Sequence, residues 1–132
     1  MRERLKRYLD DFWKALNNLE NGVKQATDEL DIDGTIKRFE LCYELSWKLI
    51  REYLSDKGII CNNPRDSFKN GFSNGLIDRE DVWLKMIEDR NDLVHKYDFK
   101  VSRSIFEHIR DSYLSSFNYL YQKIKQEEQE EV

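Results

Sequence analysis

Residues 88–98 gather side chains that together could do chemistry on a phosphate. The segment holds an arginine (Arg90), an asparagine (Asn91), a histidine (His95) and a tyrosine (Tyr97). Histidine, with a pKa of about 6.5, can transfer a proton at neutral pH. Arginine can hold a phosphate in its planar fork and stabilise charge that develops on it. These residue types favour a phosphate-bearing substrate, and the structural alternative is an arginine–aspartate network with a histidine that caps the helix.

The relative placement of these side chains depends on the helix that carries them, predicted over about residues 79–96. Asn91 and His95 are four positions apart, so they face the same way. Arg90 and His95 are five apart, which separates them by about 140° around an ideal helix axis. We therefore expect the reach of the arginine, or an unwound last turn near Tyr97, to bring the guanidinium and the imidazole together.

Other conspicuous residues have structural explanations. Glu40 and Glu44 form an i,i+4 pair, but no Glu-x-x-His motif accompanies them, so ion-paired or solvated positions are favoured over metal binding. His108 stands alone in its predicted helix, and we expect it at the surface or at the edge of the core. Three tryptophans lie on or beside hydrophobic stripes and are expected to pack in the core: Trp13, Trp47 and Trp83.

The composition is that of one helical domain. The 132 residues are 39% hydrophobic and 36% charged, with 5 glycines and 1 proline, which favours long helices over a β-sandwich. The formal net charge is −4, but without the four glutamates of residues 127–131 the acidic and basic side chains balance at 22 each. Global charge therefore neither supports nor excludes an RNA ligand. We predict a single domain over residues 1–126 and an acidic disordered tail over residues 127–132.

Several classes of protein are excluded by the sequence. No stretch approaches the ~20 apolar residues of a membrane-spanning helix, and the basic N-terminus lacks the apolar core of an export signal. Cys42 and Cys61 are therefore expected to be reduced thiols rather than a disulfide. The two cysteines and two histidines are not at ligand spacing, so we predict no metal site. These features predict a soluble, cytoplasmic protein without a membrane partner.

Hydrophobic residues at three- and four-residue intervals predict four long helices and one short helix. The first helix carries such a stripe over residues 5–23. Residues 31–34 break the pattern, with Asp33 as the expected N-cap of the second helix. The second helix, over about residues 35–57, is hydrophobic around much of its circumference, so it should lie centrally and end at Gly58.

The short helix follows the clearest punctuation in the chain. Asn63 and Pro64 are the expected N-cap and first helical residue. This helix should pack Phe68 and Phe72 against the core and end around residues 71–75.

Two long helices complete the predicted fold. Asp78 is the expected cap of the helix over residues 79–96, and the last helix is predicted over about residues 102–126. The inner face of the helix over 79–96 is expected to consist of Val82, Met86 or Ile87, Leu93 and Val94. The sequence therefore predicts an all-α fold, a four-helix up-and-down bundle plus one short helix.

At this point the motifs resemble those of a known family. Residues 90–97 fit the Arg-x4-His-x-Tyr motif of the HEPN (higher eukaryotes and prokaryotes nucleotide-binding) superfamily. More narrowly, residues 35–100 resemble the nucleotidyltransferase substrate-binding protein family. This narrower resemblance rests on an ordered set of segments: Arg38-Phe39-Glu40, Tyr43-Glu44-Leu45-Ser46-Trp47-Lys48, Asn63-Pro64-Arg65-Asp66, Gly75-Leu76-Ile77, Val82-Trp83 and Glu88-Asp89-Arg90-Asn91.

The resemblance implies a HEPN-like bundle that forms a homodimer and works with a minimal nucleotidyltransferase, as the toxin-like component of a toxin–antitoxin module. It implies a metal-independent endoribonuclease site at the dimer cleft, which needs no cofactor because substrate RNA supplies its own 2′-hydroxyl. His95 would be the acid/base catalyst and Arg90 would stabilise the pentacovalent phosphate, with Asn91 or Asp92 in an orienting role.

Further roles and one alternative also follow from the resemblance. Asp92 and Lys96 are expected to bind substrate, and Tyr97 is expected to receive AMP from the partner. Acidic neighbours such as Glu88 and Asp89 raise the pKa of a histidine and repel phosphate. A non-catalytic alternative therefore stays open, in which the chain is a subunit that binds a substrate or nucleotide for the nucleotidyltransferase.

Overall fold

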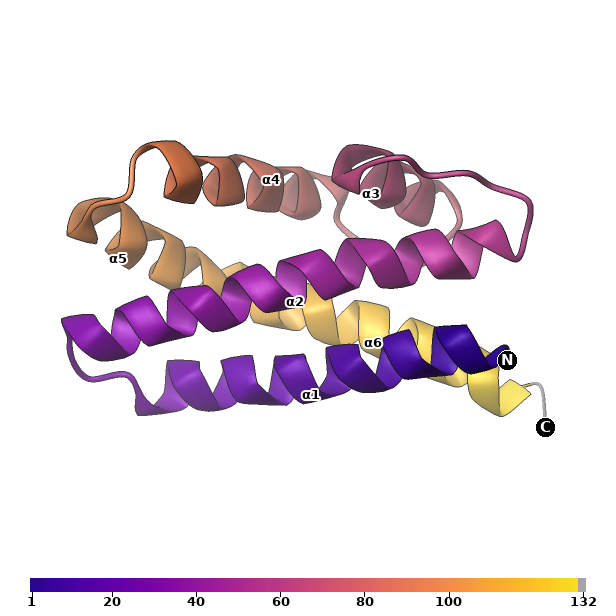
Figure 1. Ribbon diagram of the computed structural model, residues 1–132, viewed down its shortest axis with the longest axis horizontal. Helices are drawn as coiled ribbons and strands as arrows, with labels where there is room; N and C mark the ends of the chain where they lie inside the picture. Colours follow the sequence, from indigo (N-terminus) through magenta and orange to yellow (C-terminus); the bar gives the residue numbers. More distant parts are fainter. Residues whose placement is uncertain (131–132) are drawn as a thin grey trace.

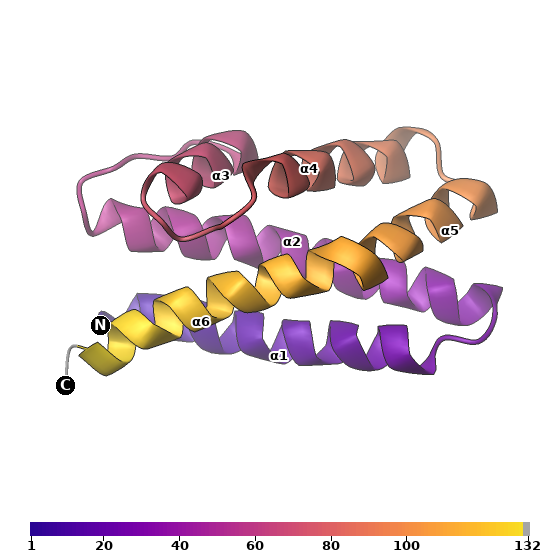
Figure 2. The same cartoon turned by 180° about the vertical axis from the view of Figure 1, so that it is seen from behind.

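The computed structural model describes residues 1–130, which fold into an all-α bundle with four arms. Two long helices form the first two arms, a pair of helices placed end to end forms the third, and a long interrupted helix crosses them as the fourth (Figures 1 and 2). The elements are α1 (Glu3–Gln25), α2 (Glu29–Ser55), α3 (Pro64–Ser73), α4 (Glu80–His95), α5 (Phe99–His108), the π-helical turn η1 (Ile109–Tyr113) and α6 (Leu114–Glu130). The predicted all-α fold, a four-helix up-and-down bundle with one short helix, is confirmed.

The loop between α2 and α3 follows the predicted punctuation. Gly58 has a φ of +80°, and the next backbone N–H, of Ile59, donates to the carbonyl of Leu54 across the helix end. Glycine adopts this left-handed conformation without the steric cost that other residues incur. Asn63 is the N-cap of α3 and Pro64 is its first residue, so the short helix begins where the sequence predicted.

The start of α2 was predicted too late. The helix begins at Glu29 with Asp28 as N-cap, and the Asp28 carboxylate accepts from the backbone N–H of Asp31. Asp33, the expected cap, and Gly34, the expected break, both lie inside the helix. The interior glycine costs only about 0.5–1 kcal/mol relative to alanine, too little to end a helix that is well capped upstream and packed along its length.

The boundaries of the third and fourth arms also differ from the prediction. α4 begins at Glu80 after Arg79, without a side-chain cap, so Asp78 is not the N-cap. The fourth arm begins at Phe99 rather than Ser102, because the Asp98 carboxylate caps the earlier turn. A five-residue π-helical turn interrupts this arm at η1, which the hydrophobic spacing did not indicate.

The predicted acidic tail is helical over residues 127–130. Helix α6 continues through Glu130, and the Lys125 ammonium lies 2.8 Å from the Glu128 carboxylate one turn later. This i,i+3 pair supports the last turns of the helix. Residues 127–130, which were predicted to belong to a disordered tail, are thus helical in the structure, and residues 131–132 lie outside the described part of the chain.

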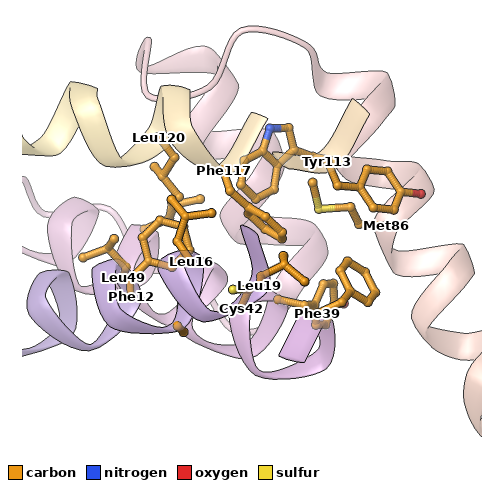
Figure 3. Packing of buried hydrophobic residues seen from close by; sticks show 14 of the residues in the cluster. Phe12, Leu16, Leu19, Phe39, Cys42, Leu49, Met86, Tyr113, Phe117 and Leu120 are labelled. Carbon is orange, nitrogen blue, oxygen red and sulfur yellow. The ribbon is translucent and has the colours of Figure 1, made fainter. Parts of the chain in front are cut away.

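The core is a continuous cluster of aromatic and aliphatic side chains between the four arms. Phe117 of α6 lies 5.8 Å from Phe12 of α1 and 5.5 Å from Trp83 of α4, measured between ring centroids. Phe39 of α2 stacks on Tyr113 at 5.5 Å. Figure 3 shows these side chains, where labelled, converging from different helices. No helix within residues 1–130 is long and apolar enough to cross a membrane.

Three hydrophobic residues expected in the core are exposed instead. Trp13 is 48% exposed, because its neighbour Phe12 occupies the inward position of that turn. Val94 is exposed for the same reason beside buried Leu93. Phe72 is exposed because α3 turns the i,i+3 pair Phe68 and Gly71 inward; a Cβ atom at Gly71 would lie 3.3 Å from Ile50 of α2.

Candidate functional site

A groove of about 490 Å³ opens between α2, α3 and α4. It contains two of the residues predicted for the active site, Arg90 and Asn91 of α4. The side chains that line it come from three helices and the residue preceding α3: Tyr43, Glu44, Trp47, Asn63, Pro64, Arg65, Ile87, Arg90 and Asn91.

Helix α4 presents one face to this groove. Ile87, Arg90 and Asn91 are spaced i, i+3 and i+4, so they share that face. His95 is four residues after Asn91 and therefore points in nearly the same direction as Asn91 one turn later, about 140° around the axis from Arg90, where it is exposed at the helix end. His95 does not line the groove, and the face that carries it continues beyond the groove.

Arg90 and His95 were predicted to converge either through the reach of the arginine side chain or through an unwound last turn of the helix. The structure rules out the unwound turn. Helix α4 runs without interruption to His95, and the backbone N–H of Lys96 donates to the carbonyl of Asp92 in regular i,i+4 geometry. The last turn is therefore not unwound. Five residues of regular helix separate the two backbones by about 7.5 Å along the axis, so only the long arginine side chain can shorten that separation within one chain.

The groove holds two arginines from different helices. Arg65, in the first turn of α3, is exposed, and Arg90 is partly buried. Within residues 1–130 neither guanidinium forms a salt bridge or a hydrogen bond with another side chain. Both positive charges act on the phenol of Tyr43 on α2. Burial and the adjacent Glu44 raise the pKa of Tyr43 to about 12, and the charges of Arg90 and Arg65 oppose that rise.

The α2 wall of the groove combines an aromatic ring with a carboxylate. The Trp47 indole Nε1–H donates to Glu44 Oε2 at 3.1 Å. The Arg51 guanidinium lies 5.2 Å from the centroid of the Trp47 ring, a cation–π arrangement. These contacts fix the orientation of the indole, which is half-buried and lines the groove. The expectation that Trp47 is a core residue is therefore only partly met.

Asp92, Lys96 and Tyr97 lie outside the groove. The carboxylate of Asp92 and the ammonium of Lys96 are 3.9 Å apart as an i,i+4 pair; the lysine side chain is largely solvent-exposed and the aspartate is partly exposed. The Tyr97 hydroxyl donates to the Asp33 carboxylate of α2 at 2.7 Å, and the side chain is 53% exposed. The sequence missed Asp33 as a partner because it assigned this residue to a helix cap.

Tyr97 has a raised pKa. The neighbouring Ser102 hydroxyl lowers that pKa, but the hydrogen bond to Asp33, partial burial and the negative charges of Asp33 and Glu40 together raise it. At neutral pH the phenol is therefore protonated, accessible and directed at a carboxylate.

A second polar cluster lies on the opposite, inward side of α4. Asp89 is buried, and its Oδ2 accepts from the Tyr113 hydroxyl and lies 2.8 Å from His108 Nδ1. Burial, together with the hydrogen bond to Asp89, raises the pKa of Tyr113. The sequence missed this cluster. A signal was present, because Asp89 continues the buried stripe of Met86 and Leu93, and a carboxylate in a hydrophobic stripe needs a partner.

Comparison with known proteins places the chain in a family. The family model described as nucleotidyltransferase substrate binding protein like matches residues 7–126. The chain belongs to this family. The resemblance drawn from the ordered segments of the sequence is thereby confirmed, and the match spans all the helices that form the groove.

Individual relatives agree with this placement. A Haemophilus influenzae protein named probable ribonuclease HepT is 27% identical over 103 residues, which cover 74% of this chain and 70% of that protein. A solved Haemophilus influenzae structure, described as the fold of a substrate binding domain of a nucleotidyltransferase, is 25% identical with a TM-score of 0.80. That match covers 89% of this chain and 98% of the Haemophilus influenzae chain in the solved structure.

A third relative shares the fold. A Shewanella oneidensis structure of a tri-AMPylated HEPN toxin in complex with its MNT antitoxin is 21% identical with a TM-score of 0.78, over 96% of this chain and 99% of the toxin. Among residues 1–130 of the present chain, no group of three or more histidines, cysteines or acidic residues is placed to hold a metal ion.

Proposed function

We propose that this chain is the HEPN, toxin-like component of a two-component module whose other member is a minimal nucleotidyltransferase. Relatives named as a probable ribonuclease and as a HEPN toxin bound to an MNT antitoxin support this role. Within it, we propose that the chain forms a homodimer that cleaves RNA without a metal ion.

The reaction uses the chemistry of the RNA itself. The ribose 2′-oxygen attacks the adjacent phosphorus while its proton passes to a base, and the bond from phosphorus to the 5′-oxygen breaks. The leaving oxygen takes up a proton, which yields a cyclic phosphate and a 5′-hydroxyl. His95 is the proton-transfer group, Arg90 stabilises the charge on the phosphorane oxygens, and Asn91 orients the phosphate.

The observation that carries this proposal is that the arginine and the histidine of the motif are accessible to a ligand. Arg90 has no anionic partner among the described residues, and His95 is exposed on the face that runs on from the groove. Because the two side chains leave one helix about 140° apart, a second copy of the chain completes the site with its own pair. The exposed Lys96 and Asp92 at the same helix end contact the flanking RNA.

Two matched histidine variants test the nuclease. Purified wild-type protein is expected to cleave single-stranded RNA in the presence of a chelator. His95→Ala should reduce the cleavage rate roughly 10²–10⁴-fold, the usual contribution of a general acid–base group, with an unchanged circular dichroism spectrum. His108→Gln is the control, because this histidine belongs to the inward cluster and should retain cleavage wherever the protein is folded.

A wild-type dimer that leaves RNA intact would contradict the nuclease and favour the alternative role. In that role the chain is a non-catalytic subunit that binds a substrate or nucleotide for the nucleotidyltransferase. Size-exclusion chromatography with light scattering tests the homodimer in the same preparation.

The Tyr97 hydroxyl is the proposed site of AMP addition by the partner. Its oxygen attacks the α-phosphorus of ATP, pyrophosphate leaves, and the phenol proton passes to a base. Exposure of the side chain and the Asp33 carboxylate 2.7 Å from its oxygen support this assignment. Co-expression with the partner should add the mass of AMP to the wild-type chain and not to Tyr97→Phe. AMP found on the Tyr97→Phe chain would move the modification elsewhere.

A further inference from the structure

The groove between α2, α3 and α4 has two chemically different ends. In Figure 1 α2 runs toward the end of the bundle where α3 lies, and α4 runs away from it. Because the helices are antiparallel, Trp47 lies on the side of Ile87, and Tyr43 lies on the side of Arg90 and Asn91. One end of the groove is thus aromatic and aliphatic, with the Lys48 ammonium and the Arg51 guanidinium 5.9 and 5.2 Å from the Trp47 ring centroid, and the other end carries Arg90, which is unpaired among residues 1–130.

The cationic end has the chemistry of a phosphate site. Arg65 and Arg90 approach from separate helices, both act electrostatically on the Tyr43 phenol, and neither is neutralised by a salt bridge among the described residues. Guanidinium groups bind phosphate through paired hydrogen bonds. Arg65 lies outside the Arg-x4-His-x-Tyr motif, so the cleavage chemistry described above does not use it.

The apolar end has the chemistry of a base site. Trp47 is held in place by its hydrogen bond to Glu44 and by cation–π contacts with Lys48 and Arg51, so its orientation is fixed, and a base that stacks on the ring does so in place of one of these cations. Nucleobases stack on such rings irrespective of sequence. The Glu44 carboxylate beside it lies 3.9 Å from the Lys48 ammonium and can accept from base amino or ribose hydroxyl groups. With the ring at one end and, at the other, Arg90 unpaired among the described residues, the groove favours one orientation of a ligand that carries both a ring and a phosphate.

We propose that this groove is a subsite for one nucleotide, with its base on Trp47 and its phosphate between Arg65 and Arg90. The volume of about 490 Å³ lies within the usual range of small-ligand pockets, roughly 300–1,000 Å³. The inference rests on the proposed function for its main occupant, a nucleotide of single-stranded RNA next to the cleaved bond. A free nucleotide such as ATP has the same chemistry, and the experiment separates the two sources.

The test measures binding apart from cleavage. A labelled oligoribonucleotide that is 2′-O-methylated at every position can bind but lacks the attacking hydroxyl, and fluorescence anisotropy gives its Kd. Arg65→Ala should weaken binding about tenfold and lower the slope of log K against log salt by about one, as for a single lost phosphate contact. Arg103→Ala on α5, an exposed arginine away from the groove, is the matched control and should bind like wild type.

Substitutions of Trp47 test the base end of the subsite independently of Arg65. Trp47→Leu should weaken binding on the order of tenfold through lost stacking, and Trp47→Phe should recover part of it. ATP that displaces the oligonucleotide more effectively than unlabelled oligonucleotide supports the subsite with a free nucleotide as occupant. Equal affinities of Arg65→Ala and Arg103→Ala would overturn the subsite.

Failure of this inference and failure of the nuclease give different results. Wild-type protein that binds the oligonucleotide through Arg65 but cleaves no unmodified RNA keeps the subsite and removes the nuclease. Protein that cleaves RNA with a KM unchanged by Arg65→Ala and Trp47→Leu keeps the nuclease and removes the subsite.

Discussion

In each of two pairs of polar residues, the two members are five positions apart in the sequence. The helix conformation between the members brings one pair together and separates the other. His108 and Tyr113 span the π-helical turn η1 and both reach the same oxygen of Asp89. Arg90 and His95 span regular α-helix in α4, where five residues turn through about 140° beyond a full circle. The wider i→i+5 turn of a π-helix reduces that angle, so the first pair converges on one partner and the second pair diverges.

The comparison separates two uses of the same residue types. The inward cluster of Asp89, His108 and Tyr113 has an acid, a histidine and a tyrosine in contact, a set that could be mistaken for catalytic machinery. Asp89 is only 6% exposed, and each group already has its partner, so the cluster holds α4 against the fourth arm. On the outward side of α4, Arg90 has no salt-bridge or side-chain hydrogen-bond partner among residues 1–130 and is free to bind a ligand.

The largest expected effect is on the outward side. Arg90→Ala should lower the RNA cleavage rate about 10²–10³-fold, because it removes the group proposed to stabilise the charged phosphorane. The free energy of unfolding should change by less than about 0.5 kcal/mol, as for other partly exposed residues without partners. Cleavage assays and urea unfolding measure the two quantities. Arg90→Lys keeps the charge without the planar fork and should give an intermediate rate. If Arg90→Ala cleaves RNA at the wild-type rate, the outward side of α4 has no functional role that separates it from the inward side.

The next effect is on stability and belongs to the inward side. Asp89→Ala leaves the Tyr113 hydroxyl and the His108 ring without their shared acceptor, and a buried unsatisfied group costs about 1–3 kcal/mol. We expect urea unfolding to show a total loss of roughly 2–4 kcal/mol. Asn91→Ala, two positions away on the outward side, is the control and should change stability by less than about 0.5 kcal/mol. Similar losses in both variants would mean that the inward cluster does not hold the fold together.

Tyr113→Phe sharpens the assignment through pH. The folded state raises the pKa of Tyr113 through burial and the hydrogen bond to Asp89, so its contribution to stability is complete below the unfolded pKa of about 10. That contribution is lost as the pH rises above this value, because the unfolded chain releases the proton first. Tyr113→Phe should lower the free energy of unfolding by about 1–2 kcal/mol at neutral pH and show a shallower fall in stability above pH ~10. An alkaline fall as steep as in wild type would assign it to other tyrosines.

The sequence predicted the elements more securely than their ends. Regular hydrophobic spacing and the Asn63–Pro64 and Gly58 signals are local, so they were sufficient for the helices and for one loop. The start of α2 depends on the Asp28 carboxylate, which accepts from the backbone N–H of Asp31, whereas Asp33 was predicted as the cap. The π turn at η1 leaves no local signature, because its extra residue is accommodated by packing of Tyr113 in the core.

The candidate site likewise contains residues that the sequence could identify and residues that it could not. Arg90, Asn91 and His95 could be found because the motif lies within one helix. Arg65 and Trp47 meet them only through tertiary packing of α2, α3 and α4. Both lie in segments that carried the family resemblance, but no spacing within one helix assigned them to the site. Asp89 was missed for a different reason, since a lone acid in a hydrophobic stripe indicates a buried partner but does not identify it.

The smallest expected effect comes from the exposed counterpart of Tyr113. Tyr97 also donates its hydroxyl to a carboxylate, that of Asp33, but at the surface, where water replaces a lost partner. Tyr97→Phe should therefore change the free energy of unfolding by less than about 0.5 kcal/mol, against about 1–2 kcal/mol for Tyr113→Phe. Parallel urea titrations of the two variants measure the difference. A loss at Tyr97 as large as at Tyr113 would show that the Asp33 contact anchors the α4–α5 corner, and an accessible phenol would then no longer be free for modification without cost to the fold.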